Sequence, residues 1–525
     1  MLRSAYPDVE IPELSIHDYL FGDLDDAALD RVAIVDGSSG AETTYRQLVG
    51  QISLFAGALA ARGIGVGTTV GVLCPNIPAF ATVFHGILRA GATATTINSL
   101  YTSDEIAGQL QDAEAGWLVT VSPLLAGAAE AAARLGIADD HVIVLDGAEG
   151  HPSLRDLLGE GRAAPDVSFD PATHLAVLPY SSGTTGRPKG VMLTHRNLVA
   201  NVAQARELLS VGPDDRVLAV LPFFHIYGMT VLLNFALMQR AGLVTMPKFD
   251  LVEFLRIIQE HRTTWVFVAP PIAVALAKHP IVDQYDLSAI KVIFSGAAPL
   301  DGALAAAVEK RLDCEVVQGY GMTETSPAVN LIPAERPEID KSSIGPLVPN
   351  TEARVVDPET GADVEVPDTG ASEPGELWVR GPQVMVGYLN RPAETAEMLD
   401  ADGWLRTGDI ATVTADGIFR IVDRLKELIK YKGYQVAPAI LEAVLLEHPL
   451  VADAAVIGAH DDDGQEVPKA FIVRQADAEL SADDVMAFVA SHVAPHEKVR
   501  QVEFIDIIPK SSSGKILRKD LRAAL

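Results

Sequence analysis

One loop carries more information about this chain than any other segment, and it reads Tyr180-Ser181-Ser182-Gly183-Thr184-Thr185-Gly186-Arg187-Pro188-Lys189-Gly190. It follows the apolar run Leu175–Leu178, which predicts a buried strand, and it precedes a helical pattern near Asn197–Leu209. Glycines let backbone N–H groups approach an anion, the hydroxyls donate hydrogen bonds, and Lys189 adds positive charge. The spacing differs from the G-x-x-x-x-G-K-[ST] of the P-loop. We therefore expect a strand-to-helix loop that binds phosphate and is not a P-loop.

Short apolar runs alternate with helical patterns on both sides of this loop, up to about residue 320. The runs lack the alternation of a half-exposed strand, so they predict parallel strands that are covered on both faces. A sheet of this kind binds its ligand at the carboxyl ends of the strands. The expected strands are Thr69–Cys74, Trp117–Val121, Val217–Leu221, Leu243–Met246, Trp265–Val268 and Val292–Phe294.

The pattern changes near Thr351, where short alternating strands such as Glu352–Val356 and Gly375–Val379 follow one another with Gly and Pro turns between them. After Asp423 a new α+β pattern begins and continues for roughly 100 residues, enough for a small domain. We predict a large α/β domain over 1–425, with a β-rich subdomain over about 351–425, and a small mobile α+β domain over 426–525.

Composition limits the possible partners and compartment. The chain has 525 residues and a formal net charge of −29, which argues against binding to nucleic acid. Its two cysteines, Cys74 and Cys314, have no metal-ligand spacing, so a disulfide scaffold and a Cys-rich zinc site are excluded and a reducing cytoplasm is expected. Residues 420–433 and 510–522 are locally positive. These two segments either attract an anionic ligand or form solvated helix faces. Their charge alone does not distinguish between these two interpretations.

A long apolar stretch from Val217 to Met238 is long enough to span a bilayer. Pro222, His225 and Gly228 interrupt it near its middle, where helix breakers are unfavourable in a membrane. We expect a buried strand, a turn and a buried helix rather than an integral membrane span. The first ten residues contain no apolar segment of a signal peptide, in keeping with a cytoplasmic protein.

Further motifs give the chain a specific resemblance. Together with the loop at 180–190, it is similar to the acyl-adenylate-forming superfamily, which includes acyl-CoA synthetases, adenylation domains and beetle luciferases. The stretches Pro222–Gly228 and Asp423–Pro438 look most like the 4-coumarate–CoA ligase branch. The other motifs, in chain order, are Ser295–Leu300, Gln318–Glu324, Gly403–Asp409, Val422–Pro438 and Pro509–Arg518.

The resemblance implies a reaction in two steps that uses ATP, Mg²⁺ and coenzyme A. A carboxylate first attacks the α-phosphate of ATP to give acyl-AMP, and the thiol of coenzyme A then displaces AMP. The first step brings two anions together, so positioned positive charge should dominate over acid–base catalysis. Lys515 resembles the family lysine that bridges the substrate carboxylate and the α-phosphate. A lysine acetyltransferase acting on Lys515 is a further expected partner, because acetylation removes this charge.

The resemblance also implies a nucleotide site. Glu324 would hold Mg²⁺ with Thr184, Tyr320 would stack on adenine, and Asp409 and Arg424 would bind the ribose hydroxyls. The implied catalytic residues are Lys515, His225, Thr323 and Glu324. The implied nucleotide-binding residues are Ser181, Ser182, Gly183, Thr184, Thr185, Gly186, Lys189, Gln318, Gly319, Tyr320, Thr323, Asp409, Arg424, Lys426, Lys430, Gln435 and Lys515.

An apolar acyl pocket is implied beside the nucleotide, with His225 gating the approach to the acyl carbonyl. In plant 4-coumarate–CoA ligases a serine hydroxyl lies where this chain has Val231, which makes cinnamate-like or aliphatic acids credible substrates. The pocket residues carried over are His225, Ile226, Tyr227, Val231, Ser295, Gly296, Ala297, Gly319, Gly321, Pro327 and Ala328.

For the second step, the resemblance assigns Lys248, Lys432 and Gly433 to coenzyme A. Lys430 and Gln435 resemble residues that serve the two alternative poses of the small domain, and Lys426 marks the hinge between those poses.

Taken together, these patterns predict a cytoplasmic, AMP-forming acid–CoA ligase for a cinnamate- or 4-coumarate-like aryl acid. Ligation of a medium- or long-chain fatty acid and acyl transfer to a carrier protein remain alternatives. A non-catalytic nucleotide sensor is disfavoured because every catalytic position is filled, and no motif demands the oxygen chemistry of a luciferase.

Overall fold

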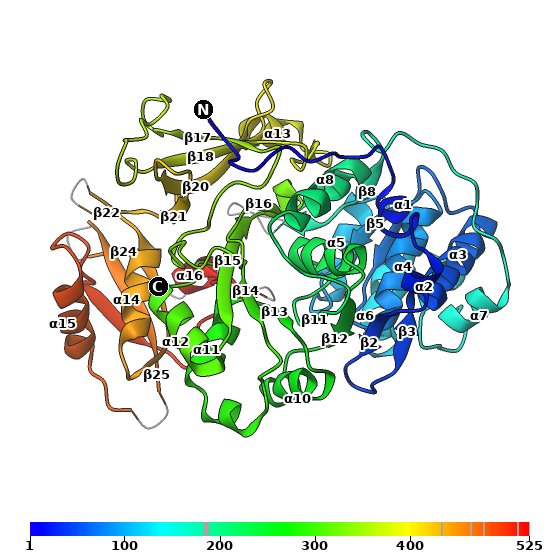
Figure 1. Cartoon of the computed structure of the whole chain (residues 1–525), viewed down its shortest axis with the longest axis horizontal. Helices are drawn as coiled ribbons and strands as arrows, with labels where there is room; N and C mark the ends of the chain where they lie inside the picture. The colour runs from blue at the N-terminus through cyan, green and yellow to red at the C-terminus, as the bar shows by residue number, and fades with distance from the viewer. Residues whose placement is uncertain (182–187, 432–433, 462–464, 476–477, 512–513, 524–525) are drawn as a thin grey trace.

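The computed structural model describes residues 1–181, 188–431, 434–461, 465–475, 478–511 and 514–523, and the side chains of 434 and 435 are likewise outside the described part. In Figure 1 the α/β region occupies the right and centre, the β-rich subdomain lies across the top, and the small C-terminal domain, orange to red, lies at the left. The predicted α/β class with a small C-terminal domain is confirmed.

The first sheet of the large domain is mainly parallel and has the order β19-β10-β8-β5-β4-β6-β7, with β9 paired to β10. Its central strands are buried on both faces, as their unbroken apolar sequences predict. The bounds are β4 (Thr69–Val72), β5 (Thr93–Thr96), β6 (Trp117–Thr120), β7 (Val142–Val144), β8 (Leu175–Val177), β9 (Tyr180–Ser181), β10 (Lys189–Thr194) and β19 (Gly387–Tyr388).

The second sheet has the order β16-β15-β14-β13-β11-β12-β2-β3 and is parallel from β15 to β2. An antiparallel strand closes each edge. The bounds are β2 (Val32–Asp36), β3 (Glu42–Thr44), β11 (Arg216–Ala219), β12 (Gly242–Thr245), β13 (Trp265–Val268), β14 (Val292–Ser295), β15 (Glu315–Gly321) and β16 (Ala328–Leu331).

Helices pack against both sheets, and most share one large apolar core with them, while the helices over 103–112 and 125–135 pack in two smaller apolar clusters. Several begin with side-chain caps; for example, the Thr44 hydroxyl and Gln47 form a reciprocal capping box at the start of the longest helix. Their bounds are α1 (Ile16–Phe21), α2 (Asp26–Leu29), α3 (Tyr45–Ala61), α4 (Pro78–Arg89), α5 (Ser103–Asp112), α6 (Leu125–Leu135), α7 (Leu154–Gly159), α8 (His195–Arg206), α9 (Phe235–Met238), α10 (Leu251–His261), α11 (Pro270–Lys278) and α12 (Gly302–Leu312), with short 3₁₀ segments at Ser122–Leu124, Asp139–His141, Pro280–Gln284 and Thr323–Thr325.

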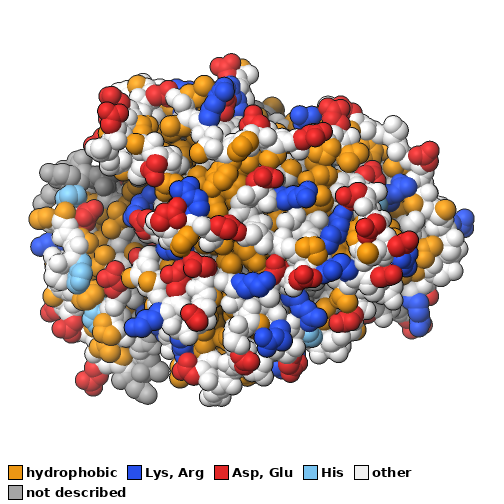
Figure 2. All heavy atoms as spheres, viewed as in Figure 1, with side chains coloured by type: hydrophobic (Ala, Val, Ile, Leu, Met, Phe, Trp, Pro, Cys, Tyr) orange, Lys and Arg blue, Asp and Glu red, His pale blue; other side chains and the backbone are white. Residues whose placement is uncertain are grey.

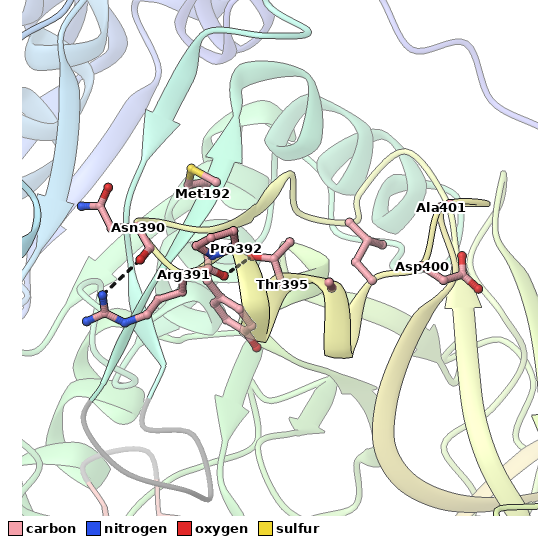
Figure 3. A pocket seen from close by; sticks show the side chains of 10 residues that line it. Met192, Asn390, Arg391, Pro392, Thr395, Asp400 and Ala401 are labelled. Carbon is pink, nitrogen blue, oxygen red and sulfur yellow. Dashed lines mark hydrogen bonds between the residues drawn. The ribbon is translucent and has the colours of Figure 1, made fainter.

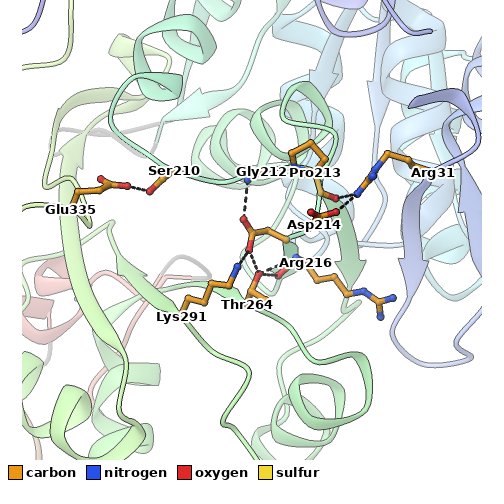
Figure 4. A network of polar contacts seen from close by, with 10 residues as sticks. Arg31, Ser210, Gly212, Pro213, Asp214, Arg216, Thr264, Lys291 and Glu335 are labelled. Atoms are coloured by element: carbon orange, nitrogen blue, oxygen red, sulfur yellow. Dashed lines mark hydrogen bonds and ion pairs between the residues drawn. The ribbon is translucent and has the colours of Figure 1, made fainter. Parts of the chain in front are cut away.

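A buried carboxylate ties together the amino ends of neighbouring strands in the second sheet (Figure 4). Asp215, just before β11, accepts hydrogen bonds from Gly212 N (2.9 Å), Thr264 Oγ1 (2.8 Å) and Lys291 Nζ (2.7 Å). Thr264 and Lys291 immediately precede β13 and β14. The polar network therefore holds together the amino ends of these strands, whereas a ligand is expected at their carboxyl ends.

The β-rich subdomain is an antiparallel sheet of order β1-β17-β18-β20-β21. Its edge strand comes from the N-terminus, where Leu2 pairs with Ala353, a long-range pairing that the sequence pattern did not indicate. The bounds are β1 (Leu2–Arg3), β17 (Glu352–Val356), β18 (Gly375–Arg380), β20 (Leu405–Val413) and β21 (Phe419–Arg424), with α13 (Pro392–Met398) beside them.

The small domain has its own apolar cores, which begin at Ile429 and share no residue with the core of the large domain. A hairpin leads into a helix and a sheet of order β24-β25-β26. The bounds are β22 (Ile429–Tyr431), β23 (Tyr434–Val436), α14 (Pro438–Glu447), β24 (Val451–His460), β25 (Glu466–Arg474), α15 (Ala482–His492), β26 (Gln501–Phe504) and α16 (Arg518–Ala523).

The expectation of a strand-to-helix loop at 180–190 is wrong. The loop is flanked by β9 and β10, which pair antiparallel with Lys189 opposite Ser181, and α8 begins only at His195. The six residues Lys189–Thr194 form a strand because they also pair with β8 and β19 in the sheet. The helix N-terminus is therefore not at the loop.

The apolar stretch from Val217 to Met238 forms a buried strand, a turn and a buried helical segment, as predicted. It contains β11, a π-helix over Tyr227–Asn234 and then α9. Over the described residues, the structure contains no helix whose length and apolar character suit a membrane crossing. On the face shown in Figure 2, acidic and basic side chains are interspersed rather than gathered into one patch.

Buried imidazoles should make the fold sensitive to acid. His195 is fully buried at the start of α8, and its Nδ1 accepts a hydrogen bond from Ile16 N at 3.2 Å. Burial, followed by the nearby His174 and His17, lowers the pKa of His195 to about 3. Below pH 6.5 the unfolded chain therefore binds a proton that the native chain does not, so stability falls by about 1.4 kcal/mol per pH unit for this group.

We expect His195→Asn to flatten this dependence, because the amide oxygen replaces the Nδ1 acceptor but does not titrate. Thermal midpoints of the two proteins, measured at equal scan rates from pH 7 to pH 4, check this. The wild-type midpoint should fall more steeply, whatever the offset between the two proteins at pH 7. Parallel curves would contradict the assignment.

Candidate active site

The predicted site residues follow the carboxyl ends of neighbouring parallel strands, where a ligand is expected. His225 lies beyond β11, Ser295 ends β14, and Thr323 and Glu324 follow β15. The first sheet contributes Ser181, at the end of β9. Residues that are more than 140 positions apart in the chain thus meet at one edge of the large domain.

Glu324 is the centre of one polar group in this site. It is only 6% exposed, and its Oε1 accepts hydrogen bonds from Ser181 Oγ at 3.1 Å and from Tyr388 OH at 2.7 Å. Lys189 lies over the ring of Tyr388, with Nζ 4.9 Å from the centroid. Burial and the Glu324 charge raise the pKa of Tyr388, so its phenol remains a hydrogen-bond donor. The arrangement gathers one carboxylate and one cation beside the 180–190 loop.

Tyr320, Asp409 and Arg424 form a second polar group. Tyr320 OH donates to Asp409 Oδ2 at 2.5 Å, and Arg424 Nε lies 3.3 Å from Asp409 Oδ1. The Asp409 backbone is fixed by a hydrogen bond of 3.1 Å to Thr407 Oγ1, and Gly408 between them takes a φ of +71° within β20. These contacts bring together three of the residues expected at adenine and ribose.

The side chain of Gln318 forms hydrogen bonds with the backbone around it. Its Oε1 accepts from Leu300 N at 3.1 Å, and its Nε2 donates to Leu300 O at 3.0 Å and to Lys341 O at 2.5 Å. Its neighbour Gly319 leaves no room for a side chain, because a Cβ there would lie 2.7 Å from Phe294 Cζ and 2.8 Å from Asn330 O. Gln318 therefore shapes the wall of the site through hydrogen bonds to the backbone.

Lys515 enters the site from the small domain on a tight turn. Ser511 N donates to Lys515 O at 2.8 Å, and Gly514 N donates to Ser511 O at 2.9 Å. Gly514 has a φ of +83°, and a Cβ on it would lie 3.0 Å from Ala269 Cβ of the large domain. The turn thus packs closely against the residues that follow β13, and only glycine combines this conformation with this close approach.

The Lys515 amine interacts electrostatically with both polar groups and with His225. Burial is the main cause that lowers the pKa of Lys515 to about 8, followed by the Arg424 charge, while Asp409 and Glu324 oppose the shift. Burial, followed by the Lys515 charge, lowers the pKa of His225 to about 4. At neutral pH the site therefore contains a charged Lys515 beside a neutral imidazole.

An apolar wall lies on the His225 side. The Tyr227 ring fills the space beside Gly296, where a Cβ would lie 2.8 Å from Tyr227 Cε1. Val231 is 4% exposed on the π-helix, and the fully buried Ser295 Oγ has no hydrogen-bond partner among the described residues. Of the other predicted wall residues, Ile226, Pro327 and Ala328 are buried, whereas Ala297 and Gly321 are exposed.

Other predicted residues lie apart from this cluster or outside the described part. Lys248, Lys426 and Lys430 are exposed. Gln435 pairs with Lys430 through the β22–β23 backbone, and its side chain is not described. The predictions that fall outside the described residues are Ser182, Gly183, Thr184, Thr185, Gly186, Lys432 and Gly433.

The sequence analysis missed Tyr388, whose hydroxyl contacts Glu324. The sequence places it in the short run Val386–Leu389, and only the pairing of β19 with β10 brings it to the site. Its other surroundings include a cavity of about 470 Å³ that also borders Met192, Arg391 and Thr395 (Figure 3). That cavity is open and lies beside the predicted site, not within it.

Comparison with known proteins identifies the family. The model of the AMP-binding enzyme family matches residues 24–389, and the model of the AMP-binding enzyme C-terminal domain matches residues 441–515. 4-Coumarate–CoA ligase 5 of Oryza sativa subsp. japonica is 42% identical over 100% of this chain and 97% of its own length. 4-Coumarate–CoA ligase 1 of Solanum tuberosum is 41% identical over 100% and 96%.

Solved structures share the fold along the whole chain. The anthranilate CoA ligase AuaEII in complex with anthranoyl-AMP has a TM-score of 0.90 at 26% identity, covering 98% of each chain. A benzoate CoA ligase from Burkholderia xenovorans LB400 has a TM-score of 0.86 at 26% identity, covering 97% of this chain and 100% of its own. The chain belongs to the AMP-binding enzyme family. Within it, the protein is an AMP-forming acid–thiol ligase similar to the 4-coumarate–CoA ligases.

Tyr388→Phe should weaken the use of ATP without disturbing the fold. The ring that packs under Lys189 remains, but Glu324 loses a donor that fixes its carboxylate. Loss of such an orienting contact typically costs 10–100-fold in metal affinity or activity. Because the resemblance implies that Glu324 holds Mg²⁺, we expect the Mg²⁺ concentration required for half-maximal pyrophosphate release to rise by about that factor.

Tyr45→Phe is the matched control. Tyr45, in α3, also has a buried hydroxyl, which donates hydrogen bonds to Leu237 O and Ala241 O at 3.2 Å. Tyr45→Phe should lower the melting temperature about as much as Tyr388→Phe does and leave the Mg²⁺ requirement unchanged. Equal Mg²⁺ requirements in Tyr388→Phe and the wild type would show that this contact does not matter.

Proposed function

We propose that the protein joins a cinnamate-like aryl acid to coenzyme A in two steps. A carboxylate oxygen of the acid attacks the α-phosphorus of ATP, and pyrophosphate leaves. The coenzyme A sulfur then attacks the acyl carbon, its proton passes to solvent, and AMP leaves. The single observation that carries this proposal is the position of Lys515 next to Gly514, which packs against Ala269 of the large domain. There the Lys515 charge affects the pKa of His225, and the charges of Arg424, Asp409 and Glu324 affect the pKa of Lys515.

The electrostatics of this cluster suit the first step. The acid and ATP are both anionic, so a positioned cation between them lowers the barrier by offsetting their repulsion and the charge that develops at the α-phosphate. Lys515 is a point charge that enters from another domain, whereas Arg424 is already paired with Asp409. The neutral His225 beside Lys515 adds no second positive charge on the acyl side.

Mg²⁺ fits the Glu324 side of the site. It is a hard cation that is usually held by one or two carboxylates together with substrate phosphates and water. Glu324 supplies a buried carboxylate, and both of its described side-chain hydrogen bonds use Oε1. Thr184 lies outside the described residues. When bound, the ion would neutralise phosphate charge, while Ser181 and Tyr388 orient the carboxylate.

The second step is proposed to use another pose of the small domain. Lys248, Lys426 and Lys430 are exposed while Lys515 is in the site. Lys426 lies in the turn between β21 and β22, at the proposed boundary of the domains 1–425 and 426–525, and rotation there would withdraw Lys515 and bring in the β22–β23 segment. Acetylation of Lys515 would remove the charge that the first step needs.

Aromatic acids are proposed as substrates because the similar proteins are named for 4-coumarate, anthranilate and benzoate, and because the wall includes the Tyr227 ring. An ATP–pyrophosphate exchange screen over aryl and aliphatic acids of graded length tests the proposal. Exchange with aryl acids supports it, and exchange restricted to long aliphatic acids contradicts the substrate class.

Because of Val231, the pocket should bind an acid that carries a ring hydroxyl no better than the same acid without the hydroxyl, or less well. A buried hydroxyl without a partner costs about 1–3 kcal/mol, so cinnamate should be used at least as well as 4-coumarate. Val231→Thr adds a hydroxyl with little change of shape and should shift the ratio of kcat/KM towards 4-coumarate. A tenfold preference of the wild type for 4-coumarate would refute this explanation.

Lys515→Ala should slow acyl-AMP formation by about 10²–10³, the effect of removing one preorganised charge stabiliser. Thioester formation from supplied acyl-AMP should be largely retained. In the wild type, acyl-AMP formation should decline as the pH rises through about 8, because Lys515 loses its proton there. Single-turnover rates of each half-reaction from pH 6 to pH 9 measure both effects.

Lys519→Ala is the control for this variant, since Lys519 is an exposed lysine four residues further along the chain. It should leave both half-reactions and their pH profiles unchanged. If Lys515→Ala loses both half-reactions equally, its assigned role is wrong.

A further inference from the structure

A hydrogen bond joins the two domains across the proposed pivot. Asp423 is the penultimate residue of β21, the last strand of the large domain, and its Oδ2 accepts a hydrogen bond of 2.8 Å from Ala439 N in the first turn of α14. Its Oδ1 accepts from Arg424 N at 2.6 Å, and the residue is 4% exposed. Lys426 lies between the two partners in the chain, so a rotation there moves one of them relative to the other.

Helix α14 depends on this carboxylate for a cap. The residue before the helix, Ala437, has no side chain that can accept a hydrogen bond, and Pro438 at the first position has no N–H. The amide of Ala439 is therefore a donor without an intrahelical partner. Asp423 satisfies it and places negative charge at the positive end of the helix dipole. The N-terminal cap of α14 is therefore a side chain of the large domain.

The same carboxylate is connected to the Lys515 turn. Arg518 lies three residues after Lys515, and its Nη2 donates to Glu442 Oε1 and Oε2 at 2.7 Å each. Its Nε donates to Val456 O at 3.1 Å. Burial raises the pKa of Asp423, and the Arg518 charge opposes this shift. Glu442 on α14 thus fixes the segment that carries Lys515.

We propose that Asp423 is a positioning residue for acyl-AMP formation, which holds the small domain in the pose that delivers Lys515. The proposal rests on the two-step function proposed above. Asp423 reaches the reacting atoms through α14, Glu442 and Arg518 rather than by contact. The hydrogen bond to Ala439 N forms in this pose and breaks when the domain rotates, so it favours the first half-reaction and contributes nothing to the second.

Asp423→Ala tests this directly. Single-turnover formation of cinnamoyl-AMP from ATP and cinnamate should slow tenfold or more, whereas cinnamoyl-CoA formation from supplied cinnamoyl-AMP should stay within twofold of the wild type. Asp423→Asn retains an oxygen acceptor for Ala439 N but loses the charge that Arg518 faces. It should give a smaller loss in the same half-reaction.

A matched control separates this role from the loss of a helix cap. Ser481 caps α15 from within the small domain, where its Oγ accepts from Asp484 N at 3.2 Å. Ser481→Ala should lower the melting temperature about as much as Asp423→Ala does and should leave both half-reactions within twofold. A similar slowing of acyl-AMP formation in Ser481→Ala would overturn the proposal.

A double variant asks whether Asp423 acts through Lys515. If it does, Asp423→Ala combined with Lys515→Ala should form acyl-AMP no more slowly than Lys515→Ala alone. A further tenfold loss would overturn the proposal. Slow acyl-AMP formation in Lys515→Ala with a wild-type rate in Asp423→Ala would overturn it and leave the proposed function standing. Absence of acyl-AMP formation by the wild type with any acid would overturn both.

Discussion

Keeping a positive charge in a buried site is the constraint on which this structure depends. Burial disfavours the charged form of Lys515, and Arg424 adds to the cost, so the pKa falls to about 8. Asp409 and Glu324 offset part of this effect. The charges of those carboxylates help to keep the amine mostly protonated at neutral pH. An anionic substrate in the same place would further stabilise the protonated form of Lys515. The site is therefore complementary in charge to the anionic acid and ATP that it is proposed to bind.

The arrangement of the two domains follows from this constraint. A lysine built into the large domain would occupy the site at all times, whereas one on a turn of the small domain would enter and leave with the proposed rotation. The Gly514 turn makes the close contact with Ala269 possible, and the cross-domain cap at Asp423 gives the entered pose a favourable contact of its own. Neither contact is large, which suits the proposed change of pose of the small domain.

Much of the large domain can be read from the sequence because the governing interactions are local or repetitive. Unbroken apolar runs such as Trp265–Val268 predicted buried parallel strands, and the strand-end rule predicted a ligand at their carboxyl ends, where Ser295 lies. The interpretation of the Val217–Met238 stretch also held, because Pro222 and Gly228 are helix breakers wherever they occur. The strand Lys189–Thr194 was missed because sheet pairing, which is non-local, decides its conformation.

By itself, the sequence determined the fold class and the order of the motifs, because glycine-rich turns, apolar periodicity and charged residues express local physical preferences. The type of chemistry followed from the resemblance of those motifs to the acyl-adenylate-forming superfamily. Only the tertiary structure decided which of these groups meet. The contact of Tyr388 with Glu324, the pairing of Leu2 with Ala353 and the cap that Asp423 gives to α14 all join segments from different elements. Such contacts depend on how sheets and domains pack against one another, and no spacing along the chain records that geometry.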